Sequence, residues 1–364
     1  MFDLRKTPLH RHHLAAGARM VDFAGWSMPV QYEGLIAEHS SVRQSCGMFD
    51  VSHMGEFLVE GPRAADLLQH RFSNDVARLR DGRSQYTLLV NEDGGVVDDA
   101  MIYRWSEDRY LVVVNAANRE ADWETLCDSE SDAALRDITF DCALLAVQGP
   151  RTNEMIEDLV DCDLTGIRRA GILATRIAGL DCWLARTGYT GEDGFEIFLE
   201  AGDAAEVFEA LCDAGVAPVG LGARNTLRLE AGMALHGHEL SAEINPYEAN
   251  LGGVVRLNKG EFTGSQRLAQ VKSEGPARRL FGLKMESRHV PRDGYPVDTE
   301  HGTGEVSSGT YSPTLECGIA MAFLPADCKI GDAVEVMVRN QSAPARLCEL
   351  PFYSNVRRWR AKPS

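Results

Sequence analysis

Two adjacent aspartates, Asp98 and Asp99, close the segment GGVVDD, which lies between two strand-like runs. The glycines allow a tight turn with positive φ, and the β-branched valines restart a strand. Neighbouring side chains of a strand point to opposite faces, so only one of the two aspartates can face a pocket. A carboxylate in that position accepts hydrogen bonds from N–H groups of a ligand. The alternative interpretation is a solvated hairpin end, in which both carboxylates face water.

Strands and a helix must hold these aspartates in place. Alternating apolar residues predict a meander of three strands over residues 86–90, 96–103 and 110–115, with both aspartates on the middle strand. A strand over residues 51–59 and a helix over residues 61–68, which a Gly-Pro pair opens, come before it. These elements form an α+β unit.

A similar order of elements recurs further along the chain. A strand at residues 143–147 leads into a second Gly-Pro-Arg segment at residues 149–151, and strands at residues 172–177 and 181–186 follow. Its resemblance to the first unit indicates two related α+β units. Further helices are expected at residues 35–44, from a cap at Asp203 to Gly215, and at residues 225–233.

The pattern changes at about residue 278, where short strands alternate with Gly and Pro turns. This pattern predicts a small antiparallel barrel of jelly-roll or Greek-key type. The expected strands cover residues 281–285, 304–309, 318–323 and 334–338.

Composition excludes several classes of function. The 364 residues carry 54 acidic and 37 basic side chains, a net charge of -17, which disfavours wide surfaces for nucleic acid or anionic membranes. The chain has no run of 18 apolar residues, so no membrane span is expected. Residues 1–8 lack the apolar region of a signal peptide, and a cytoplasmic location is expected.

Neither cysteines nor histidines point to a metal centre. The nine cysteines are scattered, form no C-x-x-C pair and are odd in number, so we expect mostly free, buried thiols. His10, His12 and His13 cluster near the N-terminus without a cysteine or carboxylate at ligand spacing. No metal is therefore expected.

Eight segments, in order along nearly the whole chain, closely resemble the glycine cleavage system T-protein family of aminomethyltransferases. They include GARMVDFAGWSMP, TGYTGEDGFE, GLGAR and LRLEAGM. The complete set is residues 8–10, 17–29, 47–54, 94–99, 187–196, 220–224, 227–233 and 308–315.

The resemblance implies a cloverleaf-like fold of three domains around a central tetrahydrofolate site: two related α+β domains and a C-terminal antiparallel β-barrel. The implied boundaries are residues 1–51 with 143–243, residues 52–142 with 244–277, and residues 278–364. The implied reaction moves the methylene carbon from the aminomethylated lipoyl arm of a carrier, the H-protein, to tetrahydrofolate. The products are 5,10-methylenetetrahydrofolate, ammonia and the dihydrolipoyl H-protein, and no metal takes part.

The resemblance also assigns roles to individual residues. Asp98 matches the key carboxylate near folate N10, so the family selects it over Asp99. Glu196 and Arg224 match the positions that hold the pterin ring. The remaining matches, which fall in segments that line the folate pocket, are Met54, Tyr86, Tyr103, Asn115 and Tyr189.

These residue types suit the implied chemistry. A pterin edge presents paired N–H donors, which Glu196 can accept, while Arg224 can donate to the ring carbonyl. An ionised Asp98 stabilises the cationic, iminium-like carbon beside the folate. The competing interpretations are an ordinary ion pair of Glu196 with Arg224, and core packing for the tyrosines.

Two positions depart from the family pattern: Gly253 stands where an aromatic residue is usual, and Asn225 where aspartate is commoner. Both raise the question of a different one-carbon donor. The alternative functions are a folate-dependent demethylase of the dimethylsulfoniopropionate type and a folate-binding protein without turnover.

Other residues with chemical potential receive different interpretations. His53 is expected as a core or hinge histidine, and Trp26 as the anchor of a turn. Because H-proteins are acidic as a family, Arg288 and Arg292 are candidates for docking the carrier, with solvated turn charge as the alternative.

Overall fold

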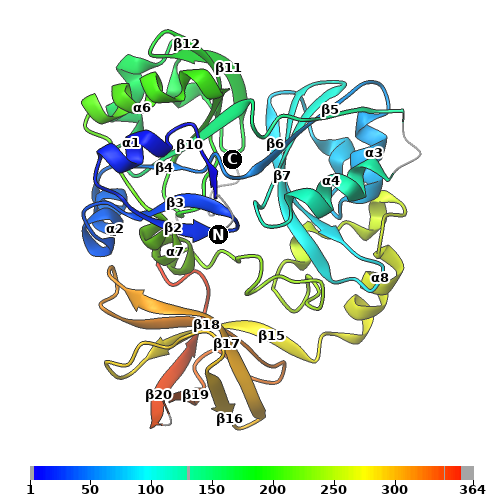
Figure 1. Ribbon diagram of the computed structural model, residues 1–364. Coiled ribbons are helices and arrows are strands. Elements are labelled where there is room, and N and C mark those ends of the chain that lie inside the picture. The colour runs from blue at the N-terminus through cyan, green and yellow to red at the C-terminus, as the bar shows by residue number, and fades with distance from the viewer. Residues whose placement is uncertain (1–3, 129–131, 340, 354–364) are drawn as a thin grey trace. The chain divides into compact units, whose positions relative to one another are not determined.

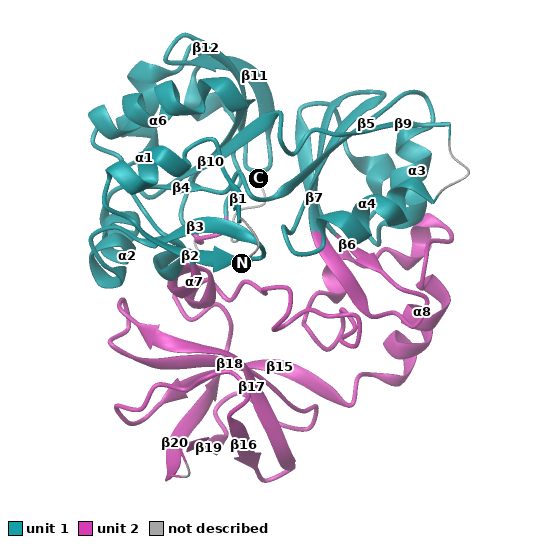
Figure 2. Cartoon of the chain, viewed as in Figure 1, with its two compact units in different colours: residues 1–87, 100–188, 192–224 teal, residues 88–99, 189–191, 225–364 magenta. Residues whose placement is uncertain are grey.

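The computed structural model describes residues 4–128, 132–339 and 341–353. Its contacts divide the chain into two compact units, coloured separately in Figure 2. Unit 1 comprises residues 1–87, 100–188 and 192–224, and unit 2 comprises residues 88–99, 189–191 and 225–364. Each unit is therefore built from three separate stretches of chain. The division into three domains, implied by the resemblance, stays a prediction.

Short helices are spread along the chain between the strands (Figure 1). The α-helices are α1 (His10–Ala15), α2 (Leu35–Gln44), α3 (Ala64–Arg71), α4 (Arg119–Cys127), α5 (Thr152–Ile156), α6 (Ala204–Asp213), α7 (Leu221–Glu230) and α8 (Ser265–Glu274). The 3₁₀ turns are η1 (Val76–Arg78), η2 (Glu157–Leu159), η3 (Leu164–Gly166), η4 (Ala201–Asp203), η5 (Gly252–Val254) and η6 (Leu257–Lys259).

A six-stranded sheet forms the centre of unit 1. Its order is β11 (Ile172–Ile177), β12 (Leu180–Ala185), β13 (Gly194–Glu200), β10 (Cys142–Gln148), β4 (Gly47–Asp50) and β14 (Ala217–Pro218). Phe195, Ile197 and Leu199 of β13 point to one face, where they join Val207, Phe208 and Leu211 of α6 in a hydrophobic core. The alternate residues of β13, which include Glu196, must point to the other face.

Two further sheets complete the strands of unit 1. One has the order β1 (Arg5–Lys6), β3 (Trp26–Gln31) and β2 (Arg19–Phe23). The other has the order β6 (Arg83–Val90), β7 (Val96–Ser106), β8 (Arg109–Val114), β5 (Gly55–Glu60) and β9 (Ala134–Asp137). The predicted meander is the β6–β7–β8 part of this sheet, and residues 88–99, at its β6–β7 hairpin, are assigned to unit 2.

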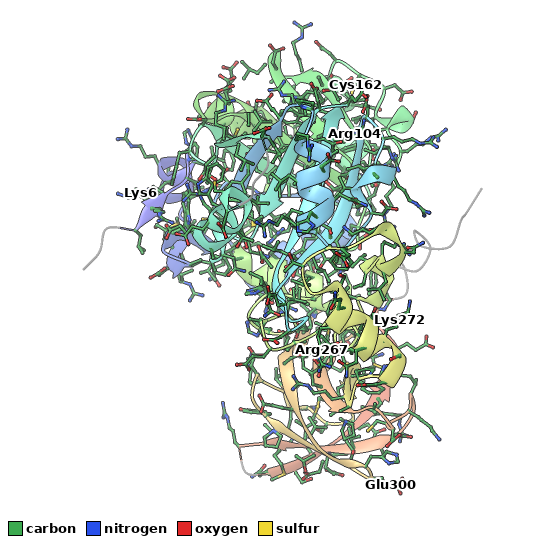
Figure 3. The ribbon with its side chains drawn as sticks, turned by 90° about the vertical axis from the view of Figure 1, so that its right-hand side faces the viewer. Lys6, Arg104, Cys162, Arg267, Lys272 and Glu300 are labelled. Atoms are coloured by element: carbon green, nitrogen blue, oxygen red, sulfur yellow. The ribbon has the colours of Figure 1, made fainter. Side chains whose placement is uncertain are left out.

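Unit 2 contains a closed barrel, as the sequence predicts. Its strands run in the order β15 (Arg278–Met285), β18 (Cys317–Pro325), β17 (Gly302–Ser312), β16 (Pro296–Thr299), β19 (Ala333–Val338) and β20 (Gln341–Cys348). Alternate residues such as Leu283, Val306 and Val336 fill its interior. Helix α8 precedes the barrel and buries Leu268 and Val271, while Arg267 and Lys272 are exposed (Figure 3).

Three local predictions were wrong in detail. The strand predicted over residues 51–59 begins only at Gly55, because the Met54 amide donates to the Val51 carbonyl and closes a turn. Asp203 precedes α6, but its side chain makes no capping hydrogen bond. The helix predicted over residues 225–233 is α7, which begins four residues earlier. Among the described residues, no helix has the length and apolar character to cross a bilayer.

Candidate active site

Glu196 lies in a row of residues across the six-stranded sheet of unit 1. It pairs with Ala146 of β10, which in turn pairs with Phe49 of β4. Directly paired residues of antiparallel strands point to the same face. Glu196 and Phe49 therefore share the face opposite the α6 core, with only the small Ala146 between them.

Two hydroxyl groups converge on one oxygen of Glu196. The Tyr103 hydroxyl donates to Glu196 Oε2 at 2.8 Å, and the Thr187 hydroxyl donates to the same oxygen. The Tyr103 ring meets the ring of Phe198 edge to face, with centroids 5.1 Å apart. Because Phe198 is two residues beyond Glu196 on β13, Tyr103 contacts the same face of the sheet with both its ring and its hydroxyl.

Arg224 lies on this same face. Its guanidinium carbon is 5.9 Å from the centroid of the Phe49 ring, in cation–π range. Burial and the positive charge of Arg224 lower the pKa of His53 to about 4, against the opposing effect of Asp50. His53 is therefore a neutral imidazole at neutral pH, and its ring meets that of Phe23 in a T-shaped contact. The face thus carries the acidic side chain of Glu196, from β13, and the guanidinium of Arg224, from α7.

Asp98 occupies the buried face of β7 in unit 2. Asp98 and its same-face neighbour Val96 are 0% exposed, and Ala100, on the same face, is 2% exposed. Asp99 is half-buried. The preceding turn is tightly packed, since Gly94 has φ +81° and a Cβ on Gly95 would lie 1.8 Å from the Ala242 carbonyl oxygen. The strand alternation thus separates the two aspartates into different environments.

The remaining predicted site residues, Met54, Tyr86, Asn115 and Tyr189, are half-buried. In unit 1, Met54 follows the turn before β5, Tyr86 lies on β6, and Asn115 follows β8. In unit 2, the Tyr189 hydroxyl donates to the carbonyl of Ala234. The structure brings together Tyr103 and Glu196 through a direct contact, and it divides the predicted residues between the two units.

Comparison with known proteins shows the family of this chain. A family model described as the GCVT N-terminal domain matches residues 9–259, and one described as the glycine cleavage T-protein C-terminal barrel domain matches residues 278–354. The chain belongs to the glycine cleavage T-protein family. The barrel match begins at the first residue of β15.

Several relatives are similar to this chain over nearly its full length. An aminomethyltransferase of Symbiobacterium thermophilum is 48% identical and covers 98% of this chain and 99% of its own. One of Rubrobacter xylanophilus is 46% identical, with 97% and 95% covered. The crystal structure of glycine cleavage system aminomethyltransferase T from Bartonella henselae gives a TM-score of 0.91 at 35% identity, with 96% and 98% covered. These matches confirm the fold class and the family.

Sequence reasoning did not single out three polar residues around the predicted site residue Glu196. Thr187 lies in the TGYTGEDGFE segment but was not singled out. Gln148 donates to the Thr187 carbonyl at 3.0 Å, and a Cβ on Gly188 would lie 1.8 Å from the Gln148 amide oxygen. Glu56 of β5 is buried, and burial, with Asp137 and Glu196 nearby, raises its pKa to about 8. Only Thr187 carried a signal, through its place in the motif.

The N-terminal histidines have structural partners. His13 contacts Asp50 Oδ2 at 2.8 Å through Nε2 and the Tyr32 hydroxyl at 2.9 Å through Nδ1, and it is 0% exposed. Within the described ranges, no three His, Cys, Asp or Glu side chains are grouped as metal ligands. Trp26 is 2% exposed on β3.

The two departures from the family pattern have different surroundings. A Cβ on Gly253 would meet no atom within 4 Å, so the backbone there leaves space for a larger side chain. Asn225 instead accepts a hydrogen bond from Arg228 Nε at 2.9 Å. Arg288 and Arg292 are both exposed in the loop between β15 and β16.

Proposed function

We propose that this chain is the aminomethyltransferase of a glycine cleavage system, with tetrahydrofolate as its one-carbon acceptor. The observation that carries the proposal is the likeness to aminomethyltransferases over 98% of the chain at 48% identity. The same likeness extends to a solved T-protein structure. The relatives reported above are aminomethyltransferases, which favours this reaction over the sulfonium demethylase and the pure binding protein.

The proposed reaction exchanges the bonds of one carbon atom. The aminomethyl carbon forms bonds to N5 and N10 of tetrahydrofolate and loses its bonds to nitrogen and to sulfur. The two protons released from the folate nitrogens pass to the departing ammonia and to the dihydrolipoyl thiolate. No oxidant or reductant is consumed.

Glu196 and Arg224 are the residues that we assign to the pterin ring. Tyr103 and Thr187 bind Glu196 Oε2, so Glu196 Oε1 has its lone pairs available for ring N–H donors. Arg224, on the same face, supplies N–H donors for a ring carbonyl. Tyr103 is 0% exposed, so its role in this site is through Glu196 and not as a wall for the ring.

Asp98 is the residue that we assign to the reacting carbon. Its carboxylate lies on a strand whose turn is fixed by glycine packing, and such a fixed negative charge stabilises a developing cation without reorganisation. It also orients the folate nitrogen that attacks. The function requires no protein nucleophile.

The proposed partner is a lipoylated H-protein. The chain as a whole carries a charge of -17, so an acidic carrier requires local positive charge, which the exposed Arg288 and Arg292 of unit 2 supply. The cytoplasmic location stays a prediction from the sequence.

The decisive experiment measures ammonia and methylenetetrahydrofolate formed from aminomethylated H-protein and tetrahydrofolate. Wild type should turn over, and Asp98→Asn should lose about 100-fold or more in kcat, the size expected for a lost electrostatic group. Asp99→Asn is the matched control, since Asp99 faces the other side of the strand. Folate binding without product from this donor would overturn the proposal and direct attention to sulfonium methyl donors.

A further inference from the structure

Tyr103 and Thr187 come from distant parts of the sequence to one carboxylate oxygen. Tyr103 is 93 residues before Glu196 and reaches it from β7, while Thr187 reaches it from the start of the β12–β13 connection. The two hydroxyl oxygens are 3.3 Å apart. Both carry a single proton, so the cluster offers two donors to Glu196.

Both hydroxyl groups donate to the same acceptor, Glu196. Among the described residues, neither hydroxyl has another acceptor apart from the contact between the two, so each proton ends on Glu196 directly or through its neighbour. Tyr103 is fully buried, and burial together with the nearby negative charge of Glu196 raises its pKa well above 10. It therefore remains a donor at every working pH.

The two residues that carry these hydroxyls are held in place by contacts of their own. The Tyr103 ring packs against Phe198, and the Thr187 carbonyl accepts a hydrogen bond from the buried Gln148. Two charge-assisted hydrogen bonds from fixed donors restrict a carboxylate to one orientation. Glu196 Oε2 is thus held, and the hydrogen bonds that the described residues donate to the Glu196 side chain end on this oxygen.

We propose that Tyr103 and Thr187 are positioning residues that hold Glu196 as an acceptor-only carboxylate and so set the selectivity of the site for ligand edges bearing N–H donors. The inference rests on the proposed function, in which Glu196 receives the pterin edge. It assigns Tyr103 to the support of Glu196 and gives Thr187 a role equal to that of Tyr103.

The first test compares tetrahydrofolate with its 2-desamino analogue, which lacks one N–H donor group. Tyr103→Phe and Thr187→Val each remove one donor and preserve the side-chain shape. Each should raise the KM for tetrahydrofolate about 10-fold, with a smaller effect on kcat, and should reduce the preference over the analogue. Thr187→Ser, which keeps the donor, should restore the preference.

Tyr110→Phe is the matched control. Tyr110 is equally buried on the next strand, β8, and its hydroxyl donates to the Glu107 carbonyl at 3.2 Å. A purely structural role for Tyr103 would lower the unfolding midpoint or the fraction of active enzyme, as the control can, and would leave the preference between the two folates unchanged. That result would overturn the inference.

The second test uses Glu196→Gln. In the wild-type background the two donors should hold the amide oxygen, so the amide NH₂ would occupy the ligand side and oppose the N–H donors of the pterin. In a Tyr103→Phe/Thr187→Val background the amide can turn its oxygen outward. The fold-increase in KM caused by Glu196→Gln should therefore be several times larger with the donors present.

The outcomes separate this inference from the proposed function. If Glu196→Gln leaves folate affinity unchanged in both backgrounds, Glu196 is not the pterin residue and the site assignment fails. If Glu196→Gln weakens folate binding equally in both backgrounds, and the donor variants keep the preference, the site assignment stands and the positioning role fails.

Discussion

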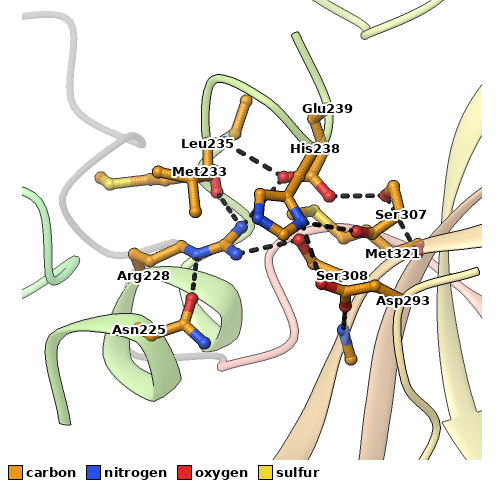
Figure 4. A network of polar contacts seen from close by, with 12 residues as sticks. Asn225, Arg228, Met233, Leu235, His238, Glu239, Asp293, Ser307, Ser308 and Met321 are labelled. Carbon is orange, nitrogen blue, oxygen red and sulfur yellow. Dashed lines mark hydrogen bonds and ion pairs between the residues drawn. The ribbon is translucent and has the colours of Figure 1, made fainter. Parts of the chain in front are cut away.

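The guanidinium of Arg228 and the carboxylate of Glu239 form an ion pair of 3.0 Å inside unit 2, with 2% and 0% of the two side chains exposed (Figure 4). Arg228 also donates to Asn225, to the Met233 carbonyl and, at 2.9 Å, to the Ser308 hydroxyl. Ser308 follows a bulge in β17, so the pair ties the end of α7 to the barrel.

We predict that Arg228→Leu destabilises the protein by about 3–5 kcal/mol, because Glu239 would remain buried without its cation. The measurement is the free energy of unfolding from denaturant titration. Arg63→Ala is a suitable control, since the Arg63–Asp66 pair is exposed and should change stability by about 0.5 kcal/mol or less. A loss below about 1 kcal/mol for Arg228→Leu would contradict the expectation.

His238 should make stability fall as the pH rises. Its hydrogen bond to Asp293, at 3.0 Å, raises its pKa above 6.5, with help from the Ser307 carbonyl and the charge of Glu239. A raised pKa in the folded state gives stability that is complete below about pH 6.5 and is lost as the pH passes through the raised value. In His238→Gln, the midpoint of unfolding should change less with pH over this range. An unchanged slope would show that the contact with Asp293 is not a charged one.

Glu56 should contribute a second fall in stability with pH. Its pKa of about 8, raised mainly by burial, exceeds the ordinary value of 4.5, so the neutral form favours the folded state. This contribution is complete below about pH 4.5 and is lost as the pH rises through about 8.

Glu56→Gln cannot ionise and should remove that part of the pH dependence. Cys142→Ala offers a directional check, because the Cys142 hydrogen bond lowers the pKa of Glu56 and its loss should move the fall to higher pH. Thermal unfolding across the range measures both. A steeper slope in Glu56→Gln than in wild type would contradict this account.

Gly95→Ala should lower both stability and turnover. The new Cβ would lie 1.8 Å from the Ala242 carbonyl oxygen, so the hairpin that precedes Asp98 would have to move. Gly202→Ala is the matched control, since a Cβ there meets no atom within 4 Å. We expect a kcat loss of about 10-fold or more for Gly95→Ala alone, as small displacements of a catalytic group have large effects. Equal activity in the two variants would show that the hairpin packing does not position Asp98.

Much of the fold could be predicted because its signals are local. The helix predicted over residues 35–44 is α2, the strand predicted over residues 172–177 is β11, and the barrel strands follow the alternation of their sequences. The strands β16 and β20 were missed for different reasons: β16 has only four residues, and β20 contains Pro344, which argues against a strand although alternate residues of β20 are buried. Turns at strand entrances, as at residues 51–54, depend on backbone hydrogen bonds that no residue pattern marks.

The candidate site could be predicted only as a set of residue types. The family resemblance indicated Glu196 and Tyr103, but the contact between them depends on the strand order of two sheets. In one sheet β13 lies between β12 and β10. Tyr103 of β7, in the other sheet, contacts Phe198 of β13. Such long-range pairing is not visible in local spacing. The role of Thr187 required the same tertiary information.

The division of each unit into three stretches has a consequence for synthesis on the ribosome. The chain passes from one unit to the other after residues 87, 99, 188, 191 and 224. Unit 1 cannot be complete until residue 224 has left the exit tunnel, and the hairpin of residues 88–99 must wait for partners made more than a hundred residues later. Nascent chains arrested before residue 224 should therefore expose the apolar strands of an incomplete unit 1 and depend on holding chaperones.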